Sequence, residues 1–84
     1  MIDWRAIADE LLDEYHACCR ARPHDNTIDI QLEKDACAKW ASHLAMQRTW
    51  GTELEIAEAC HQLVPRLERL KSMVITDILN NVTI

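Results

Sequence analysis

The fold is decided by residues 52–74, which read TELEIAEACHQLVPRLERLKSMV. Thr52 and Glu55 have the spacing of a capping box, in which each side chain accepts a hydrogen bond from the other residue's backbone N–H at the start of a helix. Apolar residues then follow at alternating steps of four and three. We call this stripe the apolar seam; its members are Ile56, Cys60, Leu63, Leu67, Leu70 and Val74. Such spacing predicts one long helix whose seam is buried against other helices.

A proline lies inside this predicted helix. Pro65 removes one backbone hydrogen bond and clashes with the preceding turn, so it kinks or breaks a helix. Because the seam continues in phase on both sides of Pro65, we expect a kink and not a break. Residues 76–84 then extend the helix, form a short fourth helix or fray; the sequence leaves these three alternatives open.

Two more helices are predicted upstream. Asp3 is a favourable N-cap, and apolar residues at steps of three and four predict a helix from Trp4 to Arg20. Turn-forming residues predict a loop at Ala21–Thr27. A second helix is expected from about Asp29 to Arg48, followed by a turn at Thr49–Gly51. We therefore predict an all-α fold, a small three-helix and possibly four-helix bundle forming a single domain over residues 1–84.

Composition and net charge limit the classes of partner that the chain can bind. The chain has 84 residues and is 49% hydrophobic, which suffices for one core, and its formal net charge is −5. Acidic residues exceed basic ones in both parts of the chain, by nine to six in residues 1–48 and by five to three in residues 49–84. Nucleic-acid binding needs a basic stripe. The charge therefore argues against nucleic acid as a partner and permits a basic protein.

The N-terminal residues are acidic and amphipathic, whereas a secretory signal is basic and then apolar. No apolar run approaches the length of a membrane span. We therefore expect a cytoplasmic protein that does not bind membranes. In that compartment its four cysteines are expected to stay reduced.

Cysteine and histidine are the residues that invite a chemical role. His16, Cys18, Cys19 and His24 lie within nine residues, and both residue types are zinc ligands. Their spacing matches no structural zinc pattern, and neighbouring side chains on a helix diverge by about 100°. No phosphate-binding loop, Gly-x-Ser-x-Gly or His-Glu-x-x-His motif is present. We therefore expect no metal, no cofactor and no catalytic residues, and keep a zinc- or thiol-dependent protein as an alternative.

The candidate partner-binding residues are an acidic helix face and one tryptophan. The acidic face lies on the first predicted helix and consists of Asp9, Glu10, Asp13 and Glu14. A solvated face is the simplest interpretation, and docking onto a basic partner is the functional one. Trp50 lies beside Gly51, outside both apolar stripes. It can anchor a partner or pack as a staple onto Leu54 or Ile56, and we expect the staple.

The long third helix exceeds what two shorter helices can cover, so we expect a homodimer. The candidate self-association residues are Ile56, Leu63, Leu67, Leu70, Val74 and Ile78. We expect a non-enzymatic protein–protein interaction module, in the style of small bacterial or phage accessory proteins that inhibit or adapt larger machinery. The alternative is a nucleic-acid-associated regulator in which the second and third helices form a helix-turn-helix. Acidic residues at the start of the third helix would then face phosphate, and these are Glu53, Glu55 and Glu58.

Overall fold

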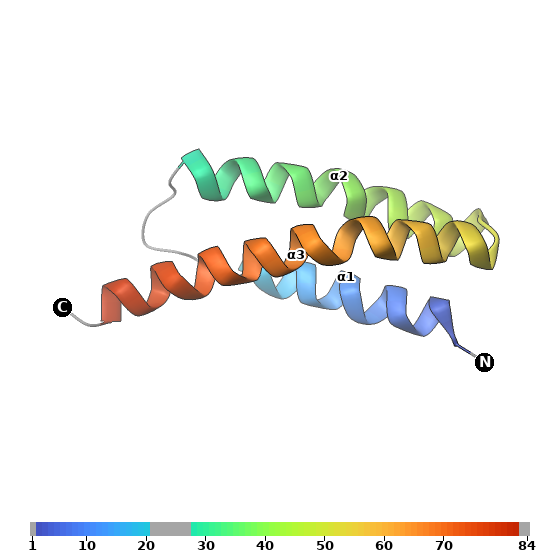
Figure 1. Cartoon of the computed structure of the whole chain (residues 1–84), viewed down its shortest axis with the longest axis horizontal. Helices are drawn as coiled ribbons and strands as arrows, with labels where there is room; N and C mark the ends of the chain where they lie inside the picture. Colours follow the sequence, from blue (N-terminus) through green and yellow to red (C-terminus); the bar gives the residue numbers. More distant parts are fainter. Residues whose placement is uncertain (1, 21–27, 83–84) are drawn as a thin grey trace.

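The computed structural model consists of three α-helices that pack along their lengths (Figure 1). It describes residues 2–20 and 28–82, so the predicted loop Ala21–Thr27 lies outside the described residues. Helix α1 covers Trp4–Arg20, α2 covers Ile28–Trp50 and α3 covers Glu53–Val82. Helices α1 and α3 run in the same direction and α2 runs opposite to both. The described ranges contain no strand, which confirms the all-α prediction, and residues 76–82 extend α3.

Two helix starts have the capping geometry that the sequence predicts. At α1, the backbone N–H of Ala6 donates to Asp3 Oδ1 at 3.2 Å. At α3, the N–H of Thr52 donates to Glu55 Oε1 at 3.1 Å, and the N–H of Glu55 donates to Thr52 Oγ1 at 3.3 Å. These bonds satisfy N–H groups that have no partner within the helix itself. Asp3 and Thr52 therefore set where α1 and α3 begin.

The turn between α2 and α3 depends on glycine. Only Gly51 and Thr52 separate the two helices, and the N–H of Gly51 donates to the carbonyl oxygen of Gln47 at 2.7 Å. A Cβ atom at Gly51 would lie 2.8 Å from that same oxygen, closer than side chains approach a backbone. The absence of a side chain thus permits the tight turn that folds α3 back along α2.

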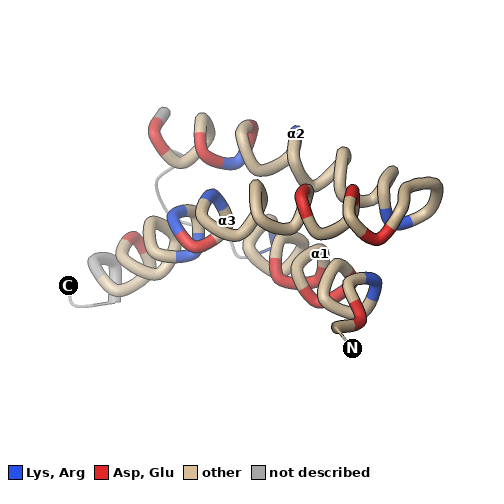
Figure 2. Tube along the Cα trace, turned by 45° about the vertical axis from the view of Figure 1, so that its right-hand side comes forward, with Lys and Arg blue, Asp and Glu red and all other residues tan. Residues whose placement is uncertain are grey.

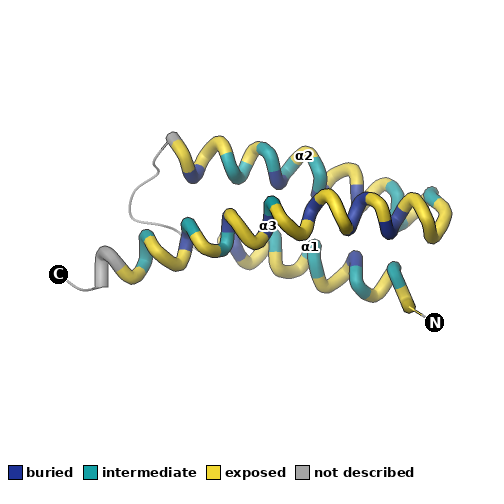
Figure 3. The backbone as a smooth tube through the Cα atoms, in the orientation of Figure 1, coloured by how far each residue is buried: buried dark blue, intermediate teal, exposed yellow. Residues whose placement is uncertain are grey.

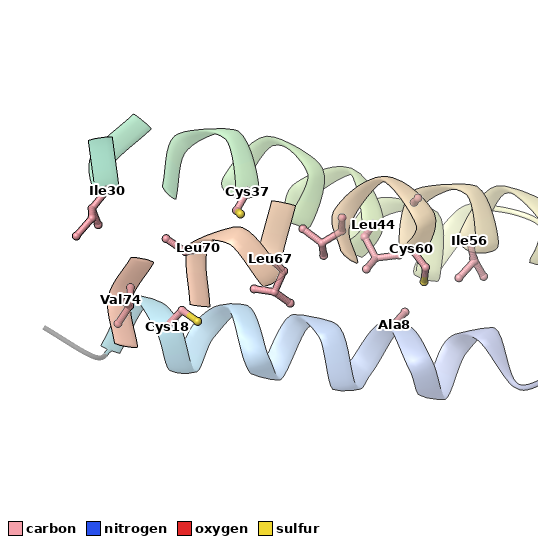
Figure 4. Packing of buried hydrophobic residues seen from close by; sticks show 12 residues of the cluster. Ala8, Cys18, Ile30, Cys37, Leu44, Ile56, Cys60, Leu67, Leu70 and Val74 are labelled. Carbon is pink, nitrogen blue, oxygen red and sulfur yellow. The ribbon is translucent and has the colours of Figure 1, made fainter. Parts of the chain in front are cut away.

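The apolar seam forms the centre of the core. None of its six residues exposes more than 3% of its surface, and buried positions turn inward on all three helices (Figure 3). Figure 4 shows seam residues between α1, which contributes Ala8 and Cys18, and α2, which contributes Ile30, Cys37 and Leu44. The prediction that the seam is buried against other helices is confirmed. The helices that bury it belong to the same chain.

Helix α3 is unbroken at Pro65. The ring of Pro65 lies on an exposed position, so the missing hydrogen bond occurs on the solvent side. The sequence expectation that the helix continues through the proline agrees with this, while a kink angle at Pro65 stays a prediction. The C-terminal turns of α3 extend beyond the ends of both α1 and α2 (Figure 1).

Candidate functional site

The acidic face of α1 is partly used to hold the helices together. Asp9 accepts two hydrogen bonds from the Arg48 guanidinium of α2, one of them from Nη2 at 2.9 Å. These hydrogen bonds lower the pKa of Asp9 from its ordinary value. Glu14 Oε2 lies 3.7 Å from Lys71 Nζ of α3. Two of the four predicted docking residues are therefore ion-pair partners between helices, and sequence reasoning missed this because Arg48 and Lys71 are far away in the chain.

The other two acidic residues remain exposed. Within the described ranges, no hydrogen bond or ion pair engages the side chain of Glu10 or Asp13. Acidic positions occur along all three helices (Figure 2). Glu10 and Asp13 are thus the part of the predicted acidic face that is available to a partner.

Trp50 lies at one end of the molecule and is 84% exposed. Met46, one turn earlier on α2, and Leu54, in the first turn of α3, are exposed as well. We call these three residues the Trp50 end. The expected staple is wrong because neither Trp50 nor Leu54 is covered. The reason is helical phase, since Trp50 lies on the side of α2 opposite the buried residue Ala41.

A polar groove of about 590 Å³ runs between α2 and α3. Its wall includes Trp40, which is half-buried, with the Arg66 guanidinium carbon 5.1 Å from the ring centroid. The His43 ring meets Trp40 edge-on at 5.6 Å. Arg66 is held in place because its Nη1 donates to the carbonyl oxygen of Gln62 at 2.6 Å. The cation–π contact and the histidine make this a packed polar wall. The contact between Arg66 and Trp40 joins two helices, so the spacing of residues along the chain could not predict it.

A second groove, of about 280 Å³, lies near the C-terminal ends of α1 and α3. We call it the C-terminal groove; its lining residues are Glu14, Ala17, Cys18, Lys71, Val74, Ile75 and Ile78. Ile78 is half-buried here, whereas the other predicted self-association residues, Ile56, Leu63, Leu67, Leu70 and Val74, lie in the core of the chain. Of the predicted set, Val74 and Ile78 line this groove.

The cysteine side chains are mostly protected. All four thiols are free, and Cys18, Cys37 and Cys60 are buried while Cys19 is exposed. Burial raises the pKa of the Cys37 thiol to about 11, and it raises the pKa values of Cys18 and Cys60. Burial and a hydrogen bond with Cys19 raise the pKa of Tyr15 to about 12. Metal ligation and nucleophilic attack need a thiolate, and the three buried sites favour the neutral thiol.

The described residues contain no group of three His, Cys, Asp or Glu side chains placed to hold a metal ion. Of the four residues behind the zinc alternative, Cys18 is buried, and His16 and Cys19 are exposed. His24 lies outside the described residues.

The helix-turn-helix alternative meets a different geometry. Helices α2 and α3 lie antiparallel and side by side (Figure 1), whereas helix-turn-helix motifs cross at roughly 90–120°. The basic residues of α3 are also engaged. Arg66 stacks on Trp40, Arg69 Nε lies 2.9 Å from Glu33 Oε1, and Lys71 pairs with Glu14. Among the described residues, this face therefore has no row of unpaired basic side chains that could contact the phosphates of a nucleic acid.

No protein-family model, curated protein or solved structure matches this chain. In the described part of the chain, none of the helices has both the length and the apolar character needed to cross a bilayer.

Proposed function

We propose that this chain is a non-enzymatic protein–protein interaction module that docks onto a larger partner through the Trp50 end. The exposure of Trp50 is the observation that carries the proposal. A tryptophan is large and apolar, and its burial at an interface contributes on the order of 2–4 kcal/mol. Trp50, Met46 and Leu54 place three such side chains at one end of the molecule.

The Trp50 end is also held rigidly. Trp50 is the last residue of α2 and Leu54 the second residue of α3, and the Gly51 turn and the Thr52 cap fix the two helices relative to each other. A backbone that is already ordered loses little conformational entropy on binding. This rigidity distinguishes the Trp50 end from an apolar side chain on a loose terminus.

Charge favours a basic partner. The chain carries a net charge of −5, and Glu10 and Asp13 project from α1 without partners among the described residues. Such a field raises the rate of encounter with a basic surface more than it raises affinity. We propose a cytoplasmic accessory protein of a bacterium or phage that inhibits or scaffolds larger machinery by covering part of its surface.

The first experiment identifies the partner by site-specific crosslinking. A photoreactive amino acid replaces Trp50 in one sample and Lys39, an exposed residue of α2, in the control sample. Both proteins are irradiated in extracts of the producing cells. We expect one protein to be crosslinked from position 50 and not from position 39. The same crosslinks from both positions would refute a specific Trp50 contact.

The second experiment measures affinity for the purified partner. Trp50→Ala is expected to weaken binding about 30-fold or more, in the range of hot-spot substitutions. Leu32→Ala is the matched control because Leu32 is also a large exposed apolar residue of α2, but lies at the helix's other end. Charge reversal of Glu10 and Asp13 is expected to slow association and to reduce its salt dependence. Equal affinities of the Trp50 and Leu32 variants would overturn the proposal.

A further inference from the structure

We propose that a second copy of this chain docks in the C-terminal groove, so that two chains form a symmetric dimer through the ends of their α3 helices. The proposal concerns the end of the molecule remote from Trp50 and does not rest on the proposed function. It also differs from the expectation that the core residues of the seam form the dimer contact, because those residues are covered by α1 and α2.

The groove is apolar at its base and lies beside exposed aliphatic side chains. Ala17 and Cys18 of α1 face Val74 and Ile78 of α3 across it. Ile75 on its wall is 54% exposed, and Leu79, one turn further, is exposed too. The C-terminal turns of α3 extend past both neighbouring helices (Figure 1), and more than half of the Ile75 surface is accessible.

The size of the groove suits what a second copy offers. Its 280 Å³ is roughly twice the 150 Å³ cavity that accepts one benzene ring, so there is room for about two aliphatic side chains. A second copy brings Ile75 and Leu79 on its own α3. In a two-fold arrangement the same patch faces itself, so each chain supplies one groove and one pair of aliphatic side chains.

Charge selects a second copy as the occupant. The rim of the groove carries one acid and one base, Glu14 and Lys71, with their charged atoms 3.7 Å apart. A two-fold axis between the chains lets these pairs exchange, so that Glu14 of each copy meets Lys71 of the other in place of the contact within its own chain.

The Trp50 end carries an acid without a basic partner. Of the two acids that flank Leu54, Glu53 lies 3.6 Å from Arg5 Nη1, whereas Glu55 has no ion-pair partner among the described residues, so two copies meeting there would bring the Glu55 carboxylates together. Two chains of net charge −5 therefore approach each other best at the C-terminal groove, whereas a basic partner suits the other end.

Sedimentation equilibrium of the full chain, under reducing conditions and with a chelator, tests the proposal. We expect the mass to rise from the 9.7 kDa of one chain to twice that value as the concentration increases, because association depends on concentration. Ile75→Asp should keep the protein monomeric. The control is Thr76→Asp, since Thr76 is the exposed neighbour outside the groove, and this variant should still dimerise. Circular dichroism at 222 nm checks that both variants remain helical.

Charge exchange tests the two-fold arrangement. Glu14→Lys alone and Lys71→Glu alone should each abolish self-association, because like charges then meet twice. A mixture of the two variants should form a heterodimer, because the charges are opposite again at both contacts. Trp50→Ala should dimerise like the wild type, which separates this result from any failure of the proposed function.

Three outcomes would overturn the proposal. The first is a wild type that stays monomeric at every concentration, the second is a wild type that gains mass only when another protein is added, and the third is a mixture of the charge variants that stays monomeric. In the first two cases the groove does not hold a second copy, and in the third the proposed pairing of Glu14 with Lys71 fails.

Discussion

The substitution Leu67→Ala tests whether the seam serves the fold of a single chain. Leu67 exposes 1% of its surface and lies between α1 and α2 (Figure 4). Truncating such a leucine removes its burial and leaves a cavity, which costs about 2–5 kcal/mol of unfolding free energy. A chain of 84 residues has a total stability of about 4–13 kcal/mol at the usual value per residue. The variant should therefore lose a large share of its stability.

Urea unfolding followed by circular dichroism measures this loss. The matched control is Leu54→Ala, the same chemical change at a position of α3 that is 70% exposed, where we expect a loss within about 0.5 kcal/mol. Both are compared with the wild type at a low and a high protein concentration. If Leu67 packs within its own chain, its cost is present at both concentrations. A cost that vanishes on dilution, or that does not exceed the cost at Leu54, would refute the intramolecular seam.

Three further predictions concern the cap and the thiols. Thr52→Ala removes the hydroxyl that accepts the hydrogen bond of the Glu55 N–H and should lower the free energy of unfolding by about 0.5–2 kcal/mol. The control is Thr76→Ala, the same change at an exposed position within α3. An equal loss for both variants in urea unfolding would contradict the capping role. In a thiol-reagent assay on the native protein, the exposed Cys19 thiol should react quickly and the three buried thiols slowly. Cys19→Ser should remove the fast phase. A fast phase that survives this substitution would contradict the assigned exposures. The pKa of the Cys37 thiol is about 11 in the fold, against an ordinary value of 9.0. As the pH rises from about 9 to 11, the unfolded chain loses this proton first, so the free energy of unfolding should fall. Cys37→Ala should weaken this pH dependence in urea unfolding, and an unchanged slope would disprove the contribution of Cys37.

The helices could be predicted because their signals are local. Asp3 and Thr52 cap α1 and α3 through atoms three residues away in the chain, so the sequence contains both partners of each contact. The seam was visible for the same reason, since helical phase alone places its residues on one side of α3. Local information also explained the continuity of the apolar side past Pro65.

The surface could not be predicted in the same way. Spacing showed that the seam must be buried, but not that α1 and α2 of the same chain supply enough cover, because this depends on contacts between distant residues. The ion pairs of Asp9 with Arg48 and of Glu14 with Lys71 are equally non-local. They reduce the predicted acidic face to Glu10 and Asp13. Trp50 was expected to pack onto Leu54 or Ile56, but Trp50 and Leu54 are exposed, whereas Ile56 is buried in the core.

The two proposed contacts together constrain how this protein can act. The C-terminal groove and the Trp50 end lie at opposite ends of a molecule that is 48 Å long. A dimer joined at the C-terminal grooves therefore leaves both Trp50 ends accessible. Two docking surfaces on one particle raise apparent affinity for a partner with repeated sites without any new contact. Ile75→Asp should then weaken binding to a repetitive partner while leaving affinity for a single isolated site unchanged, as measured with the immobilised and the soluble partner. An equal loss for both would mean that Ile75 contacts the partner directly and that dimerisation adds nothing.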